Sequence, residues 1–211
     1  MRKRGFVMEE KIKMKKTNAR NIAVIAIMGA VGFILMLLEF PLPFIIPEFI
    51  KFDFSELPAL ITTFALGPIN GIAVCLVKNL LHLFITSTGG VGELSNFILG
   101  AFFVGIAGLI YHYKKTRTGA LIGTVLGAII MALVGIATNY FITYPFYAEV
   151  FFGGNIQIII NMYKTLIPSS DTLLKCLLIF NTPFNFCKGI IDAIICFMVY
   201  KKLSPLLKPK L

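Results

Sequence analysis

Four polar side chains recur along the last apolar stretch of the chain, about residues 177–200. Asn181, Asn185, Lys188 and Asp192 stand at i, i+4, i+7 and i+11, a spacing that places them on one face of a helix. Such groups face lipid only at high cost, because no water is there to bond them. We therefore expect this polar stripe to face the interior of a helix bundle.

Two interpretations of the stripe differ in what Lys188 does. In the first, Lys188 and Asp192, one turn apart, neutralise each other and hold the helices together. In the second, Lys188 and the two asparagines line a polar cavity that binds a solute. We favour the second, because ionisable groups inside a membrane usually mark functional sites.

The preceding apolar stretch, about 119–143, ends in Asn139, Tyr140 and Tyr144. Tyrosine near a membrane surface commonly anchors a helix at the interface. Asn139, however, lies about a turn inside that boundary, near the depth of Asn181 and Asn185. One amide and two phenols at this depth also suit a flat, heteroatom-rich ligand, because rings stack and amides pair with its edge. Both interpretations stay open.

Two further pairs of polar residues lie in or beside apolar stretches. Glu93 and Asn96 open the stretch at 94–113 and are further candidates for ligand contacts, although Glu93 could serve only to favour the helix N-terminus. Lys78 and His82 are one turn apart, and we expect Lys78 to pair with an acidic neighbour and stabilise the bundle rather than bind ligand.

Composition indicates an all-α integral membrane protein. The chain is 57% hydrophobic and 14% charged, with a mean hydropathy of +0.86, which is too apolar for a soluble domain of this length. The net charge of +10 does not indicate nucleic-acid binding, because the basic residues flank apolar stretches instead of forming a patch.

Basic clusters decide the number of crossings. Fifteen of the 20 Lys and Arg residues fall in three clusters, at residues 2–20, 114–117 and 201–210. Crossing twice between 57 and 86, with a turn at Gly67-Pro68, puts all three clusters on one side. We predict a six-transmembrane-helix bundle with both termini cytoplasmic, divided into a leader (1–18), a substrate-binding domain (19–203) and a tail (204–211).

Small residues form two stripes along these helices. Gly119, Gly123 and Gly127 predict close internal packing of one helix. The second stripe, on the first span, could equally pack internally or dock against another membrane protein, and consists of Ala19, Ala23, Ala26 and Ala30. The apolar segment 155–168 is too short to span and predicts an interfacial or partly re-entrant helix that caps the outer face.

Recognised catalytic motifs are missing from the sequence. It contains no GxxxxGK[ST], no HExxH, no GxSxG and no His and Cys cluster with metal-ligand spacing. We therefore expect binding without chemistry, in a protein that is not an enzyme and needs no cofactor.

Several motifs together resemble one family. They are Lys-Phe-Asp-Phe-Ser-Glu-Leu-Pro-Ala-Leu (51–60), Phe-Ala-Leu-Gly-Pro (64–68), Val-Lys-Asn-Leu-Leu-His (77–82), Gly-Glu-Leu-Ser-Asn-Phe (92–97), Asn-Tyr (139–140) and Asn-Thr-Pro-Phe-Asn-Phe-Cys-Lys-Gly (181–189). Over about residues 20–200 the chain resembles the substrate-binding S components of energy-coupling factor (ECF) vitamin transporters, and in particular the riboflavin-specific type.

The resemblance implies a plasma-membrane protein of a prokaryote that captures riboflavin from outside, with FMN as a second candidate ligand. It implies that Asn139, Asn185 and Lys188 belong to the flavin site, and that the 39–56 loop, with Asp53, closes over it. The alanine stripe would dock on a transmembrane coupling protein, and two separate ATPases would supply the energy. Membrane lipid would surround the helices.

Three other functions remain as alternatives. The same architecture could bind another vitamin, such as pantothenate or thiamine. A stand-alone secondary carrier is a second alternative, although such carriers often show internal repeats, and none is visible here. An intramembrane enzyme is the third, disfavoured by the missing catalytic groups.

Overall fold

The computed structural model describes residues 2–207, with the side chains of residues 19–200. The side chains of the predicted leader (1–18) and tail (204–211) lie outside the described residues. The elements, in chain order, are α1 (Arg2–Leu37), β1 (Phe40–Pro41), β2 (Lys51–Phe52), α2 (Glu56–Leu66), α3 (Pro68–His82), η1 (Leu83–Ile85), α4 (Val91–Tyr113), α5 (Arg117–Thr138), η2 (Asn139–Thr143), α6 (Tyr144–Phe152), α7 (Ile156–Lys164), α8 (Leu173–Cys176), η3 (Leu177–Asn181) and α9 (Thr182–Leu207).

The predicted break in the 57–86 stretch is confirmed. Helix α2 ends at Leu66 and α3 begins at Pro68, with Gly67 between them at φ 99°. Glycine adopts this conformation without steric cost, and proline is favoured in the first turn of a helix, where its missing N–H leaves no bond unmade. Helices α2 and α3 pack against each other, so the stretch forms a helical hairpin.

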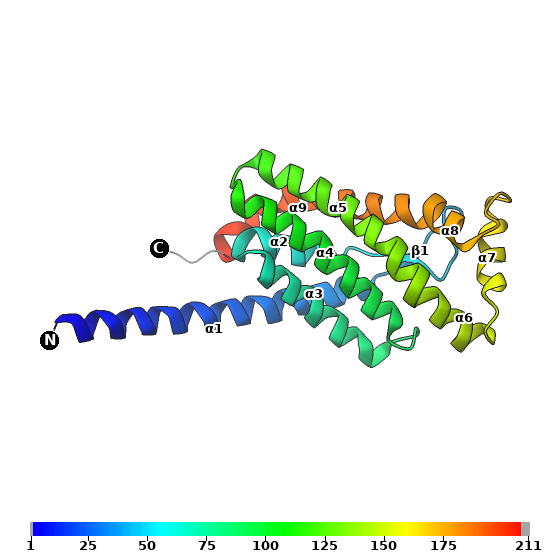
Figure 1. Cartoon of the computed structure of the whole chain (residues 1–211). Helices are drawn as coiled ribbons and strands as arrows, with labels where there is room; N and C mark the ends of the chain where they lie inside the picture. The colour runs from blue at the N-terminus through cyan, green and yellow to red at the C-terminus, as the bar shows by residue number, and fades with distance from the viewer. Residues whose placement is uncertain (1, 208–211) are drawn as a thin grey trace.

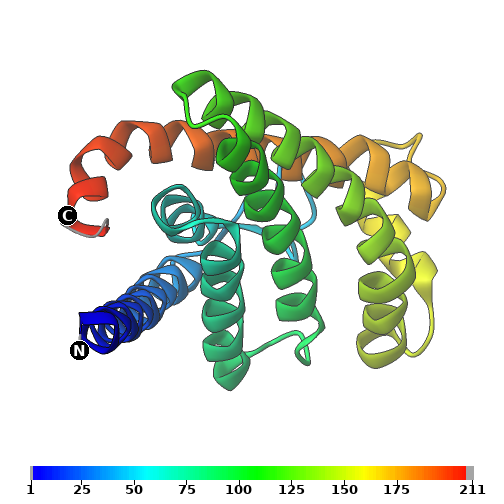
Figure 2. The ribbon, with the colours of Figure 1, turned by 60° about the vertical axis from the view of Figure 1, so that its left-hand side comes forward.

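Five helical stretches of the described residues are long and apolar enough to cross a membrane. Helix α2, with 11 residues, is shorter than this, but it lies among α1, α3 and α9 (Figure 2). Most of its side chains are buried, Thr62 and Thr63 included. A short helix with polar side chains is tolerated at membrane depth when protein surrounds it.

Two of the membrane-crossing stretches are longer than the sequence predicted. The span expected at 119–143 continues through η2 and α6 to Phe152, and the span expected at 177–200 begins four residues earlier, at Leu173. Both stretches therefore reach into residues 144–176, which lie between the two spans that the sequence predicted. Within this segment, α7 forms the short helix predicted for 155–168.

The two ends of the bundle differ. The start of α1, the α4–α5 connection and the end of α9 lie at one end, whereas α6 and α7 lie at the other (Figure 1). The basic connection Lys114–Arg117 is thus at the same end as both termini, as the charge pattern predicted. That this end faces the cytoplasm remains a prediction.

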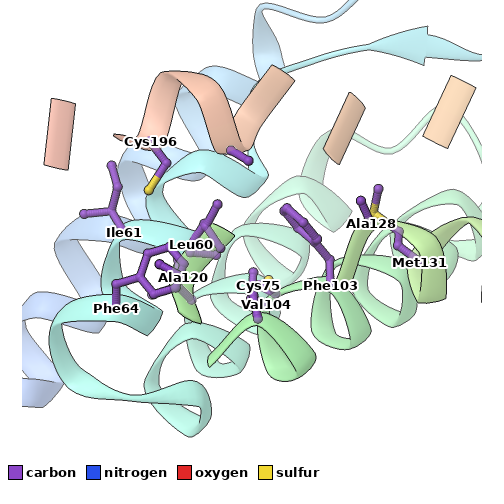
Figure 3. Packing of buried hydrophobic residues seen from close by; sticks show 14 residues of the cluster. Leu60, Ile61, Phe64, Cys75, Phe103, Val104, Ala120, Ala128, Met131 and Cys196 are labelled. Atoms are coloured by element: carbon purple, nitrogen blue, oxygen red, sulfur yellow. The ribbon is translucent and has the colours of Figure 1, made fainter. Parts of the chain in front are cut away.

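A core of apolar residues joins α2, α3, α4, α5 and α9, and its members include Leu60, Phe64, Phe103 and Met131 (Figure 3). Close helix approach explains the glycine stripe on α5. A Cβ at Gly127 would lie 2.6 Å from the Phe103 carbonyl oxygen, and one at Gly123 would lie 2.7 Å from that of Ala107. The stripe is therefore internal packing against α4.

The alanine stripe has the opposite environment. Ala19, Ala23, Ala26 and Ala30 are all exposed, while α1 buries Val24 and Gly32 on its other face, which packs against α3. Internal packing therefore does not account for the alanines, and an outward-facing small-residue surface is left on α1.

Candidate ligand-binding site

A cavity lies between the 39–56 segment and helices α3, α4, α5 and α9. Its walls combine acids, bases and amides with aromatic and aliphatic side chains. The lining residues are Met36, Glu39, Phe49, Ile50, Lys51, Asp53, Glu56, His82, Ser87, Thr88, Gly92, Glu93, Ser95, Asn96, Leu99, Met131, Asn139, Thr143, Tyr144, Tyr147, Asn181, Phe184, Asn185 and Lys188.

Eight of the nine residues proposed from the sequence as ligand contacts meet in this cavity. They come from four separate parts of the chain, and are Asp53, Glu93, Asn96, Asn139, Tyr144, Asn181, Asn185 and Lys188. Tyr140, the ninth, does not line it. Tyr140 is 40% exposed and its ring packs edge-on against Phe141 on the outer surface, as an interface anchor would.

Two prolines shape the helix segments that carry the deeper amides. Asn139 opens the π-helix η2 and Asn181 closes the π-helix η3, and each is followed within six residues by a proline, Pro145 or Pro183. A proline cannot donate to the carbonyl four residues earlier, so the helix widens locally instead of ending. Such π-bulges often occur at functional sites.

Threonine hydroxyls bond the backbone in these widened turns. Thr182 Oγ1 donates to the Leu177 carbonyl at 2.9 Å, and Thr143 Oγ1 donates to the Thr138 carbonyl at 3.4 Å. Each bond spans five residues, as in a π-helix. The arrangement lets both helices continue past the cavity while their amides line it.

Lys188 is held by two acids from outside its own helix. Its Nζ lies 2.9 Å from Asp53 Oδ2 and 2.9 Å from Glu56 Oε2. The alternative in which Lys188 pairs with Asp192 is therefore wrong. Lys188 instead lies beside two acids, one from the 39–56 segment and one from α2. Neither carboxylate oxygen of Asp192 has a hydrogen-bond partner among the described residues.

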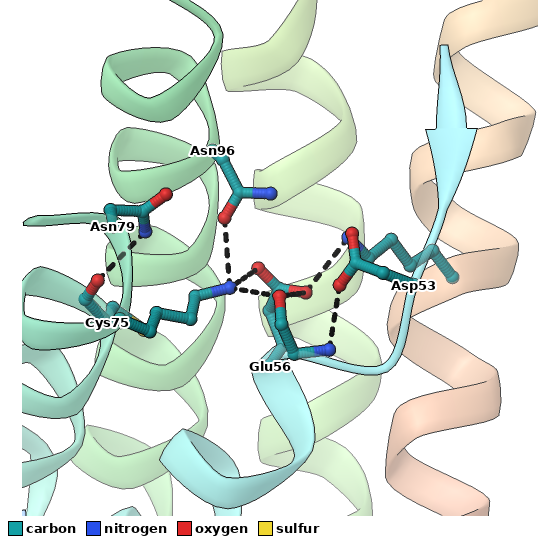
Figure 4. A network of polar contacts seen from close by, with 8 residues as sticks. Asp53, Glu56, Cys75, Asn79 and Asn96 are labelled. Carbon is teal, nitrogen blue, oxygen red and sulfur yellow. Dashed lines mark hydrogen bonds and ion pairs between the residues drawn. The ribbon is translucent and has the colours of Figure 1, made fainter. Parts of the chain in front are cut away.

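Lys78 has the structural pairing that its position predicted. Its fully buried Nζ donates to Glu56 Oε1 at 2.6 Å and to Asn96 Oδ1 at 2.9 Å, and it also bonds Ser55 Oγ. Figure 4 shows Glu56 at the centre of these contacts, with Asn96 and Asp53 on either side. Glu56 thus bridges two lysines and joins α2, α3 and α9.

Asp53 is the member of this network that lies outside the helices. Its Oδ1 also accepts a 2.7 Å hydrogen bond from the backbone N–H of Ser55. Burial by itself would raise the pKa of Asp53, but the ammonium groups of Lys188 and Lys78 outweigh burial and lower this pKa to about 2. Asp53 is therefore charged at neutral pH, and its bond to Lys188 fixes the end of the 39–56 segment.

Glu93 lies in the first turn of α4, and its side chain also contacts neighbouring residues. Its Oε1 lies 2.8 Å from His82 Nδ1, and its Oε2 accepts from Thr88 Oγ1 at 2.8 Å. These contacts tie the 86–90 connection to α3 and α4. The cavity wall at this position is therefore fixed by hydrogen bonds within the protein.

Several lining residues were not proposed from the sequence. Glu56 was not among the proposed residues, and Leu99, Met131 and Phe184 look like ordinary apolar residues of membrane helices. No local signal separates an apolar cavity wall from a lipid-facing surface. The carboxyl at the start of an apolar helix was a usable signal for Glu56.

The arrangement favours reversible binding of an uncharged polar ring system. Asn139, Asn181 and Asn185 offer amide donors and acceptors, and Phe184 and Tyr147 offer faces for stacking. Lys188 is neutralised by the two acids beside it, so it suits hydrogen bonding to a neutral ligand better than pairing with an anion. Among residues 19–200 no group of three His, Cys, Asp or Glu side chains could hold a metal ion.

Comparisons with known proteins agree with this geometry. Residues 20–200 match the family model described as the substrate-specific component of ECF transporters. The chain is 33% identical to the riboflavin transporter RibU of Staphylococcus aureus, over 93% of this chain and 96% of that protein. It is 30% identical to the riboflavin transporter FmnP of Bacillus subtilis, over 88% and 93% respectively.

A solved structure is also similar. It is described as the S component of a bacterial ECF transporter and is 32% identical to this chain. The match has a TM-score of 0.70 and covers 92% of this chain and 99% of that one.

Proposed function

Because this chain belongs to the family of substrate-specific components of ECF transporters, we propose that it binds riboflavin outside the cell and delivers it inward. The family consists of transporter subunits, so the chain is not an enzyme. Transport requires a separate transmembrane coupling protein and two ATPases, which explains why a pump subunit has no phosphate-binding loop of its own.

The observation that carries the proposal is that Asn139, Asn181, Asn185 and Lys188 meet at a cavity with aromatic walls. The isoalloxazine ring of riboflavin is flat, with carbonyl and N–H groups along one edge, and its ribityl chain carries hydroxyls. Asn139 and Asn185 pair with these groups, and Lys188 donates to a ring carbonyl. Stacking on Phe184 and Tyr147 contributes most of the buried apolar area.

The 39–56 segment covers the bound flavin in this proposal. Phe49, Ile50 and Asp53 line the cavity from this segment, and the Asp53–Lys188 bond links it to α9. A covering segment that carries both a charge contact and aromatic contacts excludes water from the ligand.

Six crossings with cytoplasmic termini form the topology that we propose. The basic connection Lys114–Arg117 lies at the same end as both termini (Figure 1), and such residues are retained on the cytoplasmic side. The cavity then faces outward and α7 lies at the outer interface. The exposed alanine face of α1 docks on the coupling protein.

Copurification and a ligand panel test the proposed substrate. Protein purified in detergent should be yellow, with the visible absorption of a flavin, and the flavin-free protein should bind riboflavin in preference to pantothenate and thiamine. FMN belongs in the same panel. A preparation without flavin that binds pantothenate or thiamine instead would assign the chain to another vitamin.

A further inference from the structure

Helix α7 is hydrogen-bonded to residues of the binding site through Tyr163. Tyr163 is fully buried, and its hydroxyl donates to Asn181 Oδ1 at 2.7 Å. Asn181 Nδ2 in turn donates to the Tyr144 hydroxyl at 2.7 Å, and the two tyrosine hydroxyls bond each other. Three groups from α6, α7 and η3 thus form a closed ring of hydrogen bonds.

The direction of each bond in the ring is fixed. Because Asn181 donates to Tyr144 and accepts from Tyr163, the remaining bond must run from the Tyr144 O–H to the Tyr163 oxygen. Every member then donates once and accepts once within the ring. Hydrogen bonds that run in one direction polarise each other, so removal of one member weakens the other two.

Tyr163 differs from its two partners in position. Asn181 and Tyr144 line the cavity, whereas Tyr163 does not. An asparagine amide has one oxygen that accepts and one nitrogen that donates. In Asn181 both are paired, with the Tyr163 and Tyr144 hydroxyls, so the amide plane is held in place at the cavity wall.

We propose that Tyr163 is a positioning residue of the ligand site, whose hydroxyl holds the Asn181 amide in the place that the bound ring system requires. The inference rests on the proposed function and gives α7 a role in it. Riboflavin, with donors and acceptors along one edge, is sensitive to the position of this amide, because a displaced amide would leave polar groups of the ligand unpaired.

The Tyr163 ring has a second contact that the hydroxyl does not share. Phe49 of the 39–56 segment packs edge-on against Tyr144 and Tyr163, with ring centroids 5.8 Å and 6.2 Å apart. Tyr163→Phe keeps this packing surface and deletes a single oxygen atom. The variant therefore separates positioning by the hydroxyl from packing of the ring.

The test measures riboflavin affinity for the wild type, Tyr163→Phe, Asn181→Ala and the double variant, each as the full chain in detergent. Tyr163→Phe should bind riboflavin roughly tenfold more weakly than the wild type, because about two hydrogen bonds are lost or weakened. The double variant should bind no more weakly than Asn181→Ala, since Tyr163 acts through that residue. Tyr200→Phe is the matched control, because Tyr200 donates to the Phe64 carbonyl at 3.0 Å, away from the cavity.

Two results would overturn the proposal. Unchanged affinity of Tyr163→Phe would show that the hydroxyl does not orient the site, and additive losses in the double variant would show that it acts independently of Asn181. Should Tyr163→Phe not fold, Tyr163→Met also deletes the hydroxyl while filling the buried space, and it must show the same coupling to Asn181. A wild type without riboflavin affinity would instead contradict the proposed function itself.

Discussion

Lys188 Nζ and Asp53 Oδ2 lie 2.9 Å apart, although 135 positions separate the two residues in the sequence. The contact joins the last long helix to the segment that covers the cavity. Both side chains are almost fully buried, so each depends on the other for its charge compensation. Ligand contacts and the position of the covering segment are therefore linked through one lysine.

Replacement of Lys188 by alanine should weaken riboflavin binding by more than about tenfold, roughly 1.4 kcal/mol. The variant removes the proposed donor to the flavin carbonyl and leaves Asp53 without its nearest cation. Equilibrium titration measures the affinity, and the unfolding temperature reports on folding. Lys175→Ala is the control, because Lys175 is exposed and pairs only locally with Asp171 at 2.7 Å. Unchanged affinity would limit Lys188 to a structural role.

Gly135→Ala should reduce riboflavin binding by roughly tenfold or more. A Cβ at Gly135 would lie 2.6 Å from Asn185 Nδ2, so the amide must move out of its present place. Gly105→Ala is the matched control, since a Cβ there meets its nearest neighbour, Ile72 Cδ1, at 3.4 Å. Equal affinities of the two variants would argue that Asn185 does not contact the ligand.

The contribution of Asp53 to stability should depend on pH. The folded state lowers the pKa of Asp53 from 3.8 to about 2, so its carboxylate stabilises the fold above about pH 4 by on the order of 2 kcal/mol. This contribution is lost as the pH falls from about 4 to about 2. Unfolding temperatures of the wild type and Asp53→Asn should differ at pH 7 and converge in acid. A difference that persists unchanged to pH 2 would contradict the assigned charge.

Substitution of Ala26 and Ala30 by phenylalanine should abolish riboflavin uptake and leave riboflavin binding unchanged. Both alanines are exposed and neither lines the cavity, so bulky side chains should obstruct only the contact with the coupling protein. Uptake by the reconstituted transporter and binding to the isolated subunit are the two measurements. Ala137→Phe, at an exposed position on α5, should leave both intact. Loss of binding in the α1 variant would show that these alanines support the site instead.

Sequence patterns predicted those features whose residues have a strong local preference of their own, either for an environment or for a backbone conformation. Lys188, Asn181 and Asn185 could be placed in the interior because polar groups in an apolar helix avoid lipid. Gly67-Pro68 could be identified as a helix break because both residues have strong backbone preferences.

Features that depend on tertiary packing could not be predicted in this way. Nothing local indicates that Asp53, rather than Asp192, is the partner of Lys188, since Asp192 is one helical turn away and Asp53 reaches it only in the fold. Pro145 was expected to lie beyond the end of a helix, but a π-bulge accommodates it. Tyr163 gave no signal, because its partners come from two other helices.

Titration of the flavin-free wild type with riboflavin, followed by the fluorescence of the flavin, tests the central claim most directly. Stacking against aromatic side chains in the cavity should quench the fluorescence, and quenching should saturate at one riboflavin per chain. Fluorescence that rises in proportion to added riboflavin, as in buffer alone, would contradict the account.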